Sequence, residues 1–143
     1  MSINKIAVVG ATGNVGREML NILSERNFPC DNVIALASER SEGDTIPFGN
    51  KDLTVENLAN YDFSDTEIAL FSAGGKTAEI YAPIAAEQGC IVIDNSSKFR
   101  MDQDIPLIVP EVNIEMLDQY RTRNIIANPN CSTIQMVVAL KPL

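Results

Sequence analysis

Histidine is absent from the 143-residue sequence, and so is tryptophan. Without an imidazole the chain holds no Cys-His pair of its own and lacks the commonest metal ligand of proteins. Its cysteines are Cys30, Cys90 and Cys131, an odd number at wide spacings that fits neither a disulfide framework nor a zinc site. We therefore expect no metal site and no structural disulfides.

Basic residues are also scarce, with 11 Lys and Arg against 19 Asp and Glu and a net charge of −8. A phosphate backbone is bound by a basic face, so nucleic acid is not an expected partner. No apolar run approaches the ~20 residues of a membrane span, and residues 1–10 do not resemble a signal peptide. We expect no membrane association and a cytoplasmic location.

The residues that are present have the composition of one soluble globular domain, with 45% hydrophobic and 21% charged side chains. Short apolar runs alternate with helical patterns along the whole chain. This alternation predicts an α/β, Rossmann-like fold, a mostly parallel doubly wound sheet with helices on both faces. The expected strands cover residues 5–9, 33–37, 68–71, 91–94 and 124–127, with short candidates at 45–48 and 53–55, and the expected helices cover residues 15–26, 75–87, about 114–120 and the stretch after 130.

The hydrophobic patterns of two expected helices predict which of their faces are buried against the sheet. In the first, Val15, Met19, Ile22 and Leu23 recur at helical spacing. In the second, Ile80, Ile84 and Ala85 are expected to face the sheet, and Pro83 predicts a kink or an early break.

A glycine loop, Gly10-Ala-Thr-Gly-Asn-Val-Gly16, joins the first expected strand to the first helix. Its G-x-x-G-x-x-G spacing is shifted from the commoner dinucleotide fingerprint, but the physical roles are similar. Gly10 permits a tight turn, Gly13 allows close approach of a pyrophosphate to the backbone, and Gly16 allows close helix packing. An ordinary turn is the alternative interpretation, and the position between a strand and a helix favours dinucleotide binding.

The second expected strand is followed by Ser38-Glu-Arg-Ser41. Hydroxyls and a guanidinium suit a ribose 2′-phosphate, whereas an acidic residue at this place suits the 2′-hydroxyl of NAD. Ser38, Arg40 and Ser41 therefore favour NADP, with Glu39 as an ambiguous acid. A solvated polar loop is the alternative.

Polar or small residues follow the next two expected strands, where open α/β sheets bind ligands. Ser72-Ala-Gly-Gly75 leaves room for a ligand, and Asn95-Ser-Ser-Lys-Phe-Arg100 ends on an arginine that can hold a phosphate through two hydrogen bonds. The alternative for Arg100 is an ordinary surface arginine.

Cys131 lies in Asn128-Pro-Asn-Cys-Ser-Thr133, directly before an apolar helical pattern. A helix start offers unpaired N–H groups and the positive end of the helix dipole, both of which stabilise a thiolate. The polar neighbours of Cys131 suit a reactive site better than the alternative, an inert buried thiol. With a dinucleotide loop on the same sheet, this thiol predicts attack on a carbonyl carbon, hydride transfer and exchange of a thioester with phosphate.

Five motifs in order resemble the amino-terminal part of the aspartate-semialdehyde dehydrogenase family. They are Gly10 to Gly16, Ser72 to Gly75, Asn95-Ser-Ser-Lys-Phe-Arg-Met-Asp102, Val109-Pro-Glu-Val-Asn113 and Asn128 to Thr133. The resemblance implies NADPH-dependent reductive dephosphorylation of β-aspartyl phosphate to aspartate semialdehyde, with release of phosphate, in lysine, threonine, methionine and diaminopimelate biosynthesis. It implies Cys131 as nucleophile with Asn130 beside it, Arg100 as substrate ligand, and a homodimer of the full-length protein.

The resemblance further implies a set of contacts to NADP from the glycine loop and the strand ends. These are Gly10, Thr12, Gly13, Asn14, Val15, Gly16, Ser38, Arg40, Ser41, Ser72, Gly74 and Asn95. The related N-acetyl-glutamyl-phosphate reductases are one alternative, against which Asn130-Cys-Ser-Thr133 argues, and a non-catalytic dinucleotide-binding module is the other.

Domain boundaries follow from the same resemblance. Residues 1–130 are expected to form the NADP-binding domain, and 131–143 to begin the cysteine helix that leads into a second domain absent from this chain. That domain supplies a histidine and a substrate-carboxylate arginine in the family, so these residues alone are expected to be inactive.

Overall fold

In the computed structural model, which describes residues 3–143, seven strands form a single sheet. Their order across the sheet is β3-β4-β2-β1-β5-β6-β7, and every neighbouring pair is parallel except β3 with β4. The strands are β1 (Ile3–Val9), β2 (Cys30–Ala37), β3 (Thr45–Phe48), β4 (Lys51–Asn57), β5 (Ile68–Phe71), β6 (Ile91–Asp94) and β7 (Ile125–Ala127). The predicted Rossmann-like, doubly wound fold is confirmed.

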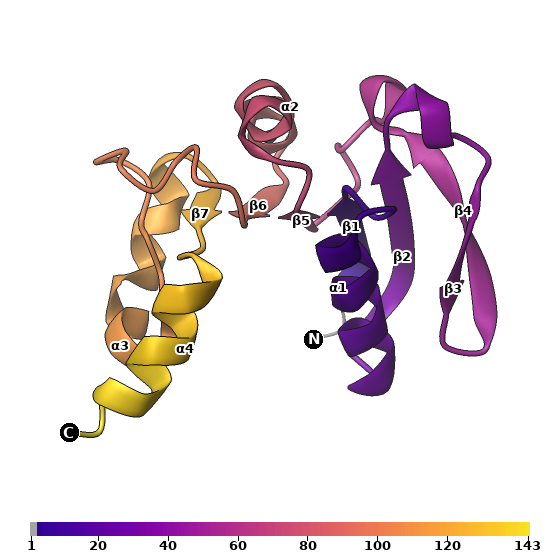
Figure 1. The fold of residues 1–143 in the computed structure, drawn as a ribbon. Helices are drawn as coiled ribbons and strands as arrows, with labels where there is room; N and C mark the ends of the chain where they lie inside the picture. Colours follow the sequence, from indigo (N-terminus) through magenta and orange to yellow (C-terminus); the bar gives the residue numbers. More distant parts are fainter. Residues whose placement is uncertain (1–2) are drawn as a thin grey trace.

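Helices connect the strands on both faces of this sheet (Figure 1). None of those in the described range is long and apolar enough to cross a membrane. The stretch expected to be helical near residue 114 is helical, with 3-10 rather than α geometry. The helices are α1 (Asn14–Glu25), α2 (Gly75–Glu87), α3 (Pro110–Asn113) and α4 (Cys131–Leu140), with the 3-10 helices η1 (Glu39–Ser41), η2 (Leu58–Asn60) and η3 (Ile114–Thr122).

Alternate residues of β1 face two separate cores. Ala7 and Val9 belong to the core under α2, whereas Val8 belongs to the core under α1, where it lies with Leu20. All four side chains are fully buried. A strand that is apolar on both faces is typical of the centre of a parallel sheet, and this burial holds the glycine loop that follows β1.

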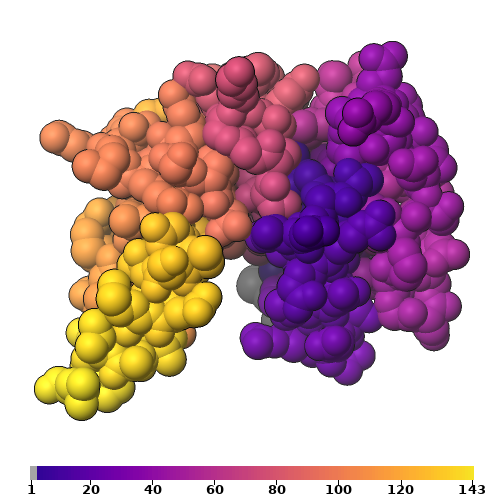
Figure 2. Space-filling model, viewed as in Figure 1, coloured from indigo at the N-terminus to yellow at the C-terminus, as the bar shows by residue number. Residues whose placement is uncertain are grey.

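The face of the sheet that carries α1 is not fully covered. Leu70 of β5 and Ile93 of β6 are only half-buried, while their neighbours Phe71 and Asp94, which point toward α2, are fully buried. Figure 2 shows a hollow between α1 and α4 on this side. The two helices therefore flank an apolar surface that neither of them covers.

The expected inner face of α2 is wrong. Ile80 and Ile84 are 57% and 41% exposed, and the helix packs instead through Ala78, Ala82, Ala85 and Ala86. Alanine side chains let the helix approach the sheet closely, so the two isoleucines, one turn apart, fall on the solvent face.

The expected early break at Pro83 is also wrong, because α2 continues through it to Glu87. A proline inside a helix leaves the carbonyl four residues earlier without its usual donor. That residue is Glu79, which is exposed, so water can satisfy its carbonyl group.

The inner face predicted for α1 is right only in part. Met19 and Leu23 pack against the core, but Val15 is 48% exposed, and the buried positions are Gly16 and Leu20. Glycine carries no apolar side chain, so a hydrophobic pattern cannot register it as an inner position.

Cys90 is the basis of a prediction about alkaline stability. Its thiol is fully buried in the core under α2, and burial raises its pKa from the ordinary value of 9.0 to about 12. Between these values the folded chain keeps the proton that the unfolded chain releases, so the stability contributed by Cys90 falls as pH rises through this window. Urea unfolding of the wild type and of Cys90→Ala at several pH values from 8 to 11 tests this. The difference between their free energies of unfolding, wild type minus variant, should shrink as pH rises. A difference that stays constant with pH would refute this effect.

Candidate active site

The turn after β1 is tight because Gly10 adopts a left-handed conformation, with φ of +84°. The Gly10 N–H donates to the Leu36 carbonyl at 2.8 Å, and the Gly13 N–H donates to the Gly10 carbonyl at 3.0 Å. A side chain at Gly10 would place its Cβ 2.9 Å from the backbone nitrogen of Ala73, which follows β5. Glycine is therefore required for the loop to fit between β1 and β5.

Gly16 is the point of closest packing in this turn. A Cβ there would lie 2.2 Å from the Gly10 carbonyl oxygen and 2.8 Å from the Ala11 Cα. The absence of a side chain brings the first turn of α1 directly against the glycine loop. The unpaired N–H groups at the start of α1, whose N-cap is Gly13, consequently lie beside the loop.

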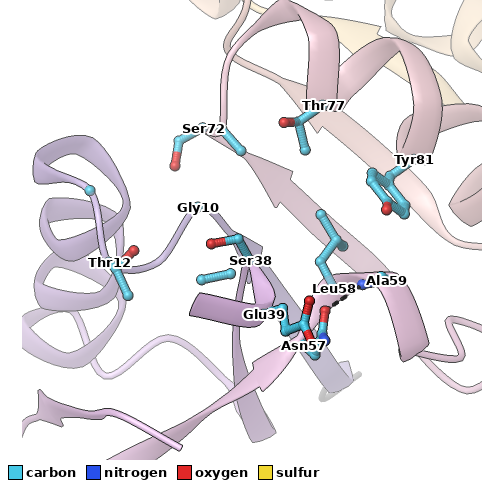
Figure 3. A pocket seen from close by; sticks show the side chains of 13 residues that line it. Gly10, Thr12, Ser38, Glu39, Asn57, Leu58, Ala59, Ser72, Thr77 and Tyr81 are labelled. Atoms are coloured by element: carbon cyan, nitrogen blue, oxygen red, sulfur yellow. Dashed lines mark hydrogen bonds between the residues drawn. The ribbon is translucent and has the colours of Figure 1, made fainter. Parts of the chain in front are cut away.

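A cavity of about 500 Å³ opens at the carboxyl ends of the strands, beside this turn (Figure 3). It lies between the ends of β1 and β5. Strands β2, β4 and β3 lie on one side of β1, and β5, β6 and β7 lie on the other, so the direction of the strand order reverses here. Open α/β sheets bind their ligands at this switch point, and a helix N-terminus there suits a phosphate. The lining residues are Gly10, Thr12, Gly13, Ala37, Ser38, Glu39, Asn57, Leu58, Ala59, Ser72, Ala73, Thr77 and Tyr81.

The cavity brings together some of the residues expected to bind the cofactor and leaves others outside its lining. Gly10, Thr12, Gly13, Ser38 and Ser72 line it. The remaining expected residues lie on the adjoining elements and are not among the lining residues: Asn14, Val15, Gly16, Arg40, Ser41, Gly74 and Asn95. The ambiguous acid of the sequence, Glu39, does line the cavity.

Two groups of lining residues were not identified from the sequence. Asn57 ends β4, and Leu58 and Ala59 begin η2 directly after it; β4 pairs in parallel with β2 and so brings its carboxyl end to the same edge. The Asn57 side chain accepts a hydrogen bond from the Ala59 N–H at 3.0 Å, which shapes this wall (Figure 3). Thr77 and Tyr81, four residues apart, present one face of α2 to the opposite wall.

Cys131 lies at the first residue of α4 and is exposed. The helix is capped by Asn130, whose side-chain oxygen accepts a hydrogen bond from the Thr133 N–H at 2.7 Å. The prediction of a cysteine at a helix start is confirmed, and the alternative of a buried thiol is wrong. Cys131 is outside the lining of the cavity and follows β7, three strands from β1 on the same edge of the sheet.

Arg100 lies beside the turn that carries the cysteine. Its Nε donates to the Asn128 carbonyl at 2.9 Å and its Nη2 to the Asn95 carbonyl at 3.0 Å. The side chain is half-buried, so the alternative of an ordinary surface arginine does not describe it. The arginine joins the segments that follow β6 and β7.

A buried carboxylate shapes the segment after β6. Asp94 is fully buried and accepts hydrogen bonds from the Ser96 N–H at 3.0 Å and the Ser96 hydroxyl at 2.6 Å. These bonds close a short turn that directs Asn95 toward Asn128. Nowhere in residues 3–143 do three Cys, Asp or Glu side chains gather so that they could hold a metal ion.

Comparison with known proteins agrees with this geometry. The model of the family described as semialdehyde dehydrogenase, NAD binding domain, matches residues 5–120. Aspartate-semialdehyde dehydrogenase 2 of Vibrio cholerae is 60% identical over 138 residues, which are 96% of this chain and 41% of that protein. The chain thus spans about two fifths of the length of the curated relatives it matches.

Solved structures give the same result. A crystal structure of aspartate semialdehyde dehydrogenase II from Vibrio cholerae, complexed with ASA, matches 99% of this chain and 46% of its own, with 58% identity and a TM-score of 0.95. The enzyme from Candida albicans, solved with NADP, matches 99% of this chain and 46% of its own, with 28% identity and a TM-score of 0.81. The resemblance predicted from the five motifs is confirmed, and the matched part is a nicotinamide-dinucleotide-binding domain. The chain belongs to the semialdehyde dehydrogenase family, and the part of that family which it matches is the NAD binding domain.

Proposed function

We propose that this chain is the NADP-binding part of an aspartate-semialdehyde dehydrogenase that reduces β-aspartyl phosphate to aspartate semialdehyde. The observation that carries the proposal is an exposed cysteine, Cys131, at a helix start on the same sheet edge as the cavity beside the glycine loop. The 60% identity to the Vibrio cholerae enzyme supports this substrate over an N-acetyl-glutamyl phosphate.

The cavity has the features that a dinucleotide requires. Gly10 closes a turn that has no room for a side chain, and the N-terminus of α1 faces the space that a pyrophosphate would take. A dinucleotide would be held along the strand ends by Gly10, Thr12, Ser38 and Ser72, which line the cavity. When bound, reduced dinucleotide supplies a hydride to the carbonyl carbon of the substrate.

Cys131 performs the covalent steps. Its thiolate attacks the acyl carbon of β-aspartyl phosphate, the carbon–oxygen bond to phosphate breaks, and phosphate leaves with the electron pair. The thioester accepts the hydride, and the tetrahedral adduct on sulfur collapses to the aldehyde and the thiolate. In both steps the sulfur lies at the start of α4, where the unpaired N–H groups and the helix dipole attract negative charge.

Arg100 would hold the phosphoryl group. Two of its five N–H donors point at backbone carbonyls, which leaves the Nη1 end of the guanidinium for an anion. Its attachment to Asn128 keeps this end close to the cysteine turn. A phosphate held there would leave in the direction of the arginine.

Cofactor choice is proposed to depend on η1, where Glu39 faces the cavity and Arg40 and Ser41 follow. We expect Arg40→Ala to weaken NADP binding roughly tenfold or more while changing NAD binding little, because a charge-assisted hydrogen bond to the 2′-phosphate is lost. Titration calorimetry with both dinucleotides measures this. The matched variant Glu39→Gln should act in the opposite direction and tighten NADP binding. Equal losses for NADP and NAD in Arg40→Ala would remove the role of Arg40.

The activity itself is tested with the full-length protein. NADPH oxidation should require β-aspartyl phosphate, and the reverse reaction should require aspartate semialdehyde, NADP and phosphate together. Turnover of N-acetyl-glutamyl phosphate in place of the aspartyl substrate would assign the chain to the related reductases instead.

A further inference from the structure

Asn128, which precedes the cysteine by three residues, is attached to β6 and the segment after it through its backbone N–H, its backbone carbonyl and its side-chain Nδ2. Its N–H donates to the Asp94 carbonyl at 2.8 Å, and its side-chain amide donates to Asn95 Oδ1 at 2.7 Å. Its carbonyl accepts from Arg100 Nε at 2.9 Å. Three hydrogen bonds, to Asp94, Asn95 and Arg100, thus restrain the residue that follows β7.

Arg100 contributes to this attachment through one edge of its guanidinium group, which donates two hydrogen bonds. Nε and Nη2 lie on the same side of the guanidinium, and they donate to the Asn128 and Asn95 carbonyls respectively. A planar fork that makes two such bonds has a fixed orientation. Arg100 therefore bridges the segments that follow β6 and β7 before any ligand is present.

The restraint on Asn128 passes directly to Cys131. Only Pro129 and Asn130 lie between them; Pro129 is buried and has a fixed φ, and Asn130 caps α4 through the Thr133 N–H. The direction in which the chain enters α4 is therefore set at Asn128. The position of the sulfur relative to the substrate depends on that direction.

We propose that Asn128 is a positioning residue for Cys131, held by Asn95 and Arg100, and that Arg100 has a second role as part of this brace. The proposal rests on the proposed function for its effect on turnover, but its effect on thiol reactivity is independent of that function. Asn128→Ala removes the bond to Asn95 Oδ1 and loosens the first turn of α4. Because Cys131 is already exposed, loosening this turn gives a reagent no better access and only moves the sulfur relative to the N–H groups that begin α4.

The test compares Asn128→Ala with Asn50→Ala in the full-length protein. Asn50 is an exposed asparagine in the turn between β3 and β4, remote from the cysteine turn. Alkylation of Cys131 by iodoacetamide at neutral pH, followed by peptide mass spectrometry, should be several-fold slower in Asn128→Ala and unchanged in Asn50→Ala. In steady-state assays kcat should fall roughly tenfold or more, with KM for both substrates within about twofold, because misplacement of a reacting group affects the transition state most.

Arg100→Lys is the second variant, because a lysine cannot hold both carbonyls at once. It should also slow the alkylation of Cys131, which a purely substrate-binding arginine would not do. Unchanged alkylation rates in Asn128→Ala and Arg100→Lys would overturn the proposal, as would a change confined to KM. If the wild type turns over no acyl phosphate, the proposed function fails while the alkylation comparison still decides the role of Asn128.

Discussion

Replacing Cys131 with alanine is expected to abolish turnover of β-aspartyl phosphate by the full-length protein, with a loss of roughly 10⁴-fold or more in kcat. The reason is that the covalent route through the thioester disappears entirely, and the remaining residues only hold the reactants. Affinity for NADP should stay within about twofold, since Cys131 is not among the residues that line the cavity. Steady-state kinetics and a dinucleotide titration on the same preparation separate the two effects.

Cys30 provides the matched control for this substitution. It begins β2, at the opposite end of the strand from the cavity, and is half-buried. Cys30→Ala should therefore retain kcat within a factor of about two to three, as expected for a change remote from the reacting groups. A Cys131→Ala enzyme that kept more than about a tenth of the wild-type rate would show that the reaction does not proceed through this sulfur.

A methyl group at Gly16 is expected to cost roughly 3 kcal/mol of folding free energy and to abolish tight dinucleotide binding. The added Cβ would lie 2.2 Å from the Gly10 carbonyl oxygen and 2.8 Å from the Ala11 Cα, and neither backbone atom can swing aside as a flexible side chain can. Relief requires moving α1 away from β1, which opens the turn that faces the cavity. Urea unfolding of Gly16→Ala measures the loss of stability.

Gly75→Ala is the comparison that isolates this close contact. Gly75 begins α2, and a Cβ there meets only the Lys98 Cβ, at 3.9 Å. Alanine should be neutral or stabilising at that position, because it favours the helix and restricts the unfolded chain. Equal unfolding free energies for Gly16→Ala and wild type would refute the packing role of Gly16.

The parts of the fold that sequence predicted well are those with local signals. Strands such as 68–71 are short apolar runs between turn residues, and the glycine loop and the capped start of α4 carry their turn and capping residues within a few positions. The orientation of α2 had no such signal. Its isoleucines look like an inner face, but the distance between helix and sheet decides which side is buried, and alanines allowed the closer approach.

The candidate site likewise contains features with local sequence signals and features that depend on contacts between distant segments. The helix start at Cys131 and the tight turn at Gly10 could be predicted, because both are properties of consecutive residues. Asn57 and Tyr81 reach the cavity only through the pairing of β4 with β2 and the placement of α2, which are contacts between distant segments. For the same reason the bonds from Arg100 to the Asn95 and Asn128 carbonyls could not be read from an arginine in a polar run.

The intact mass of the full-length protein after mixing with aspartate semialdehyde and NADP, without phosphate, tests the central claim most directly. Hydride transfer without an acceptor for the acyl group should leave one aspartyl group in thioester linkage, with an equivalent amount of NADPH formed. Peptide mapping should place that group on Cys131. NADPH formation without an adduct, or an adduct on Cys30 or Cys90, would contradict the assignment of Cys131 as the nucleophile.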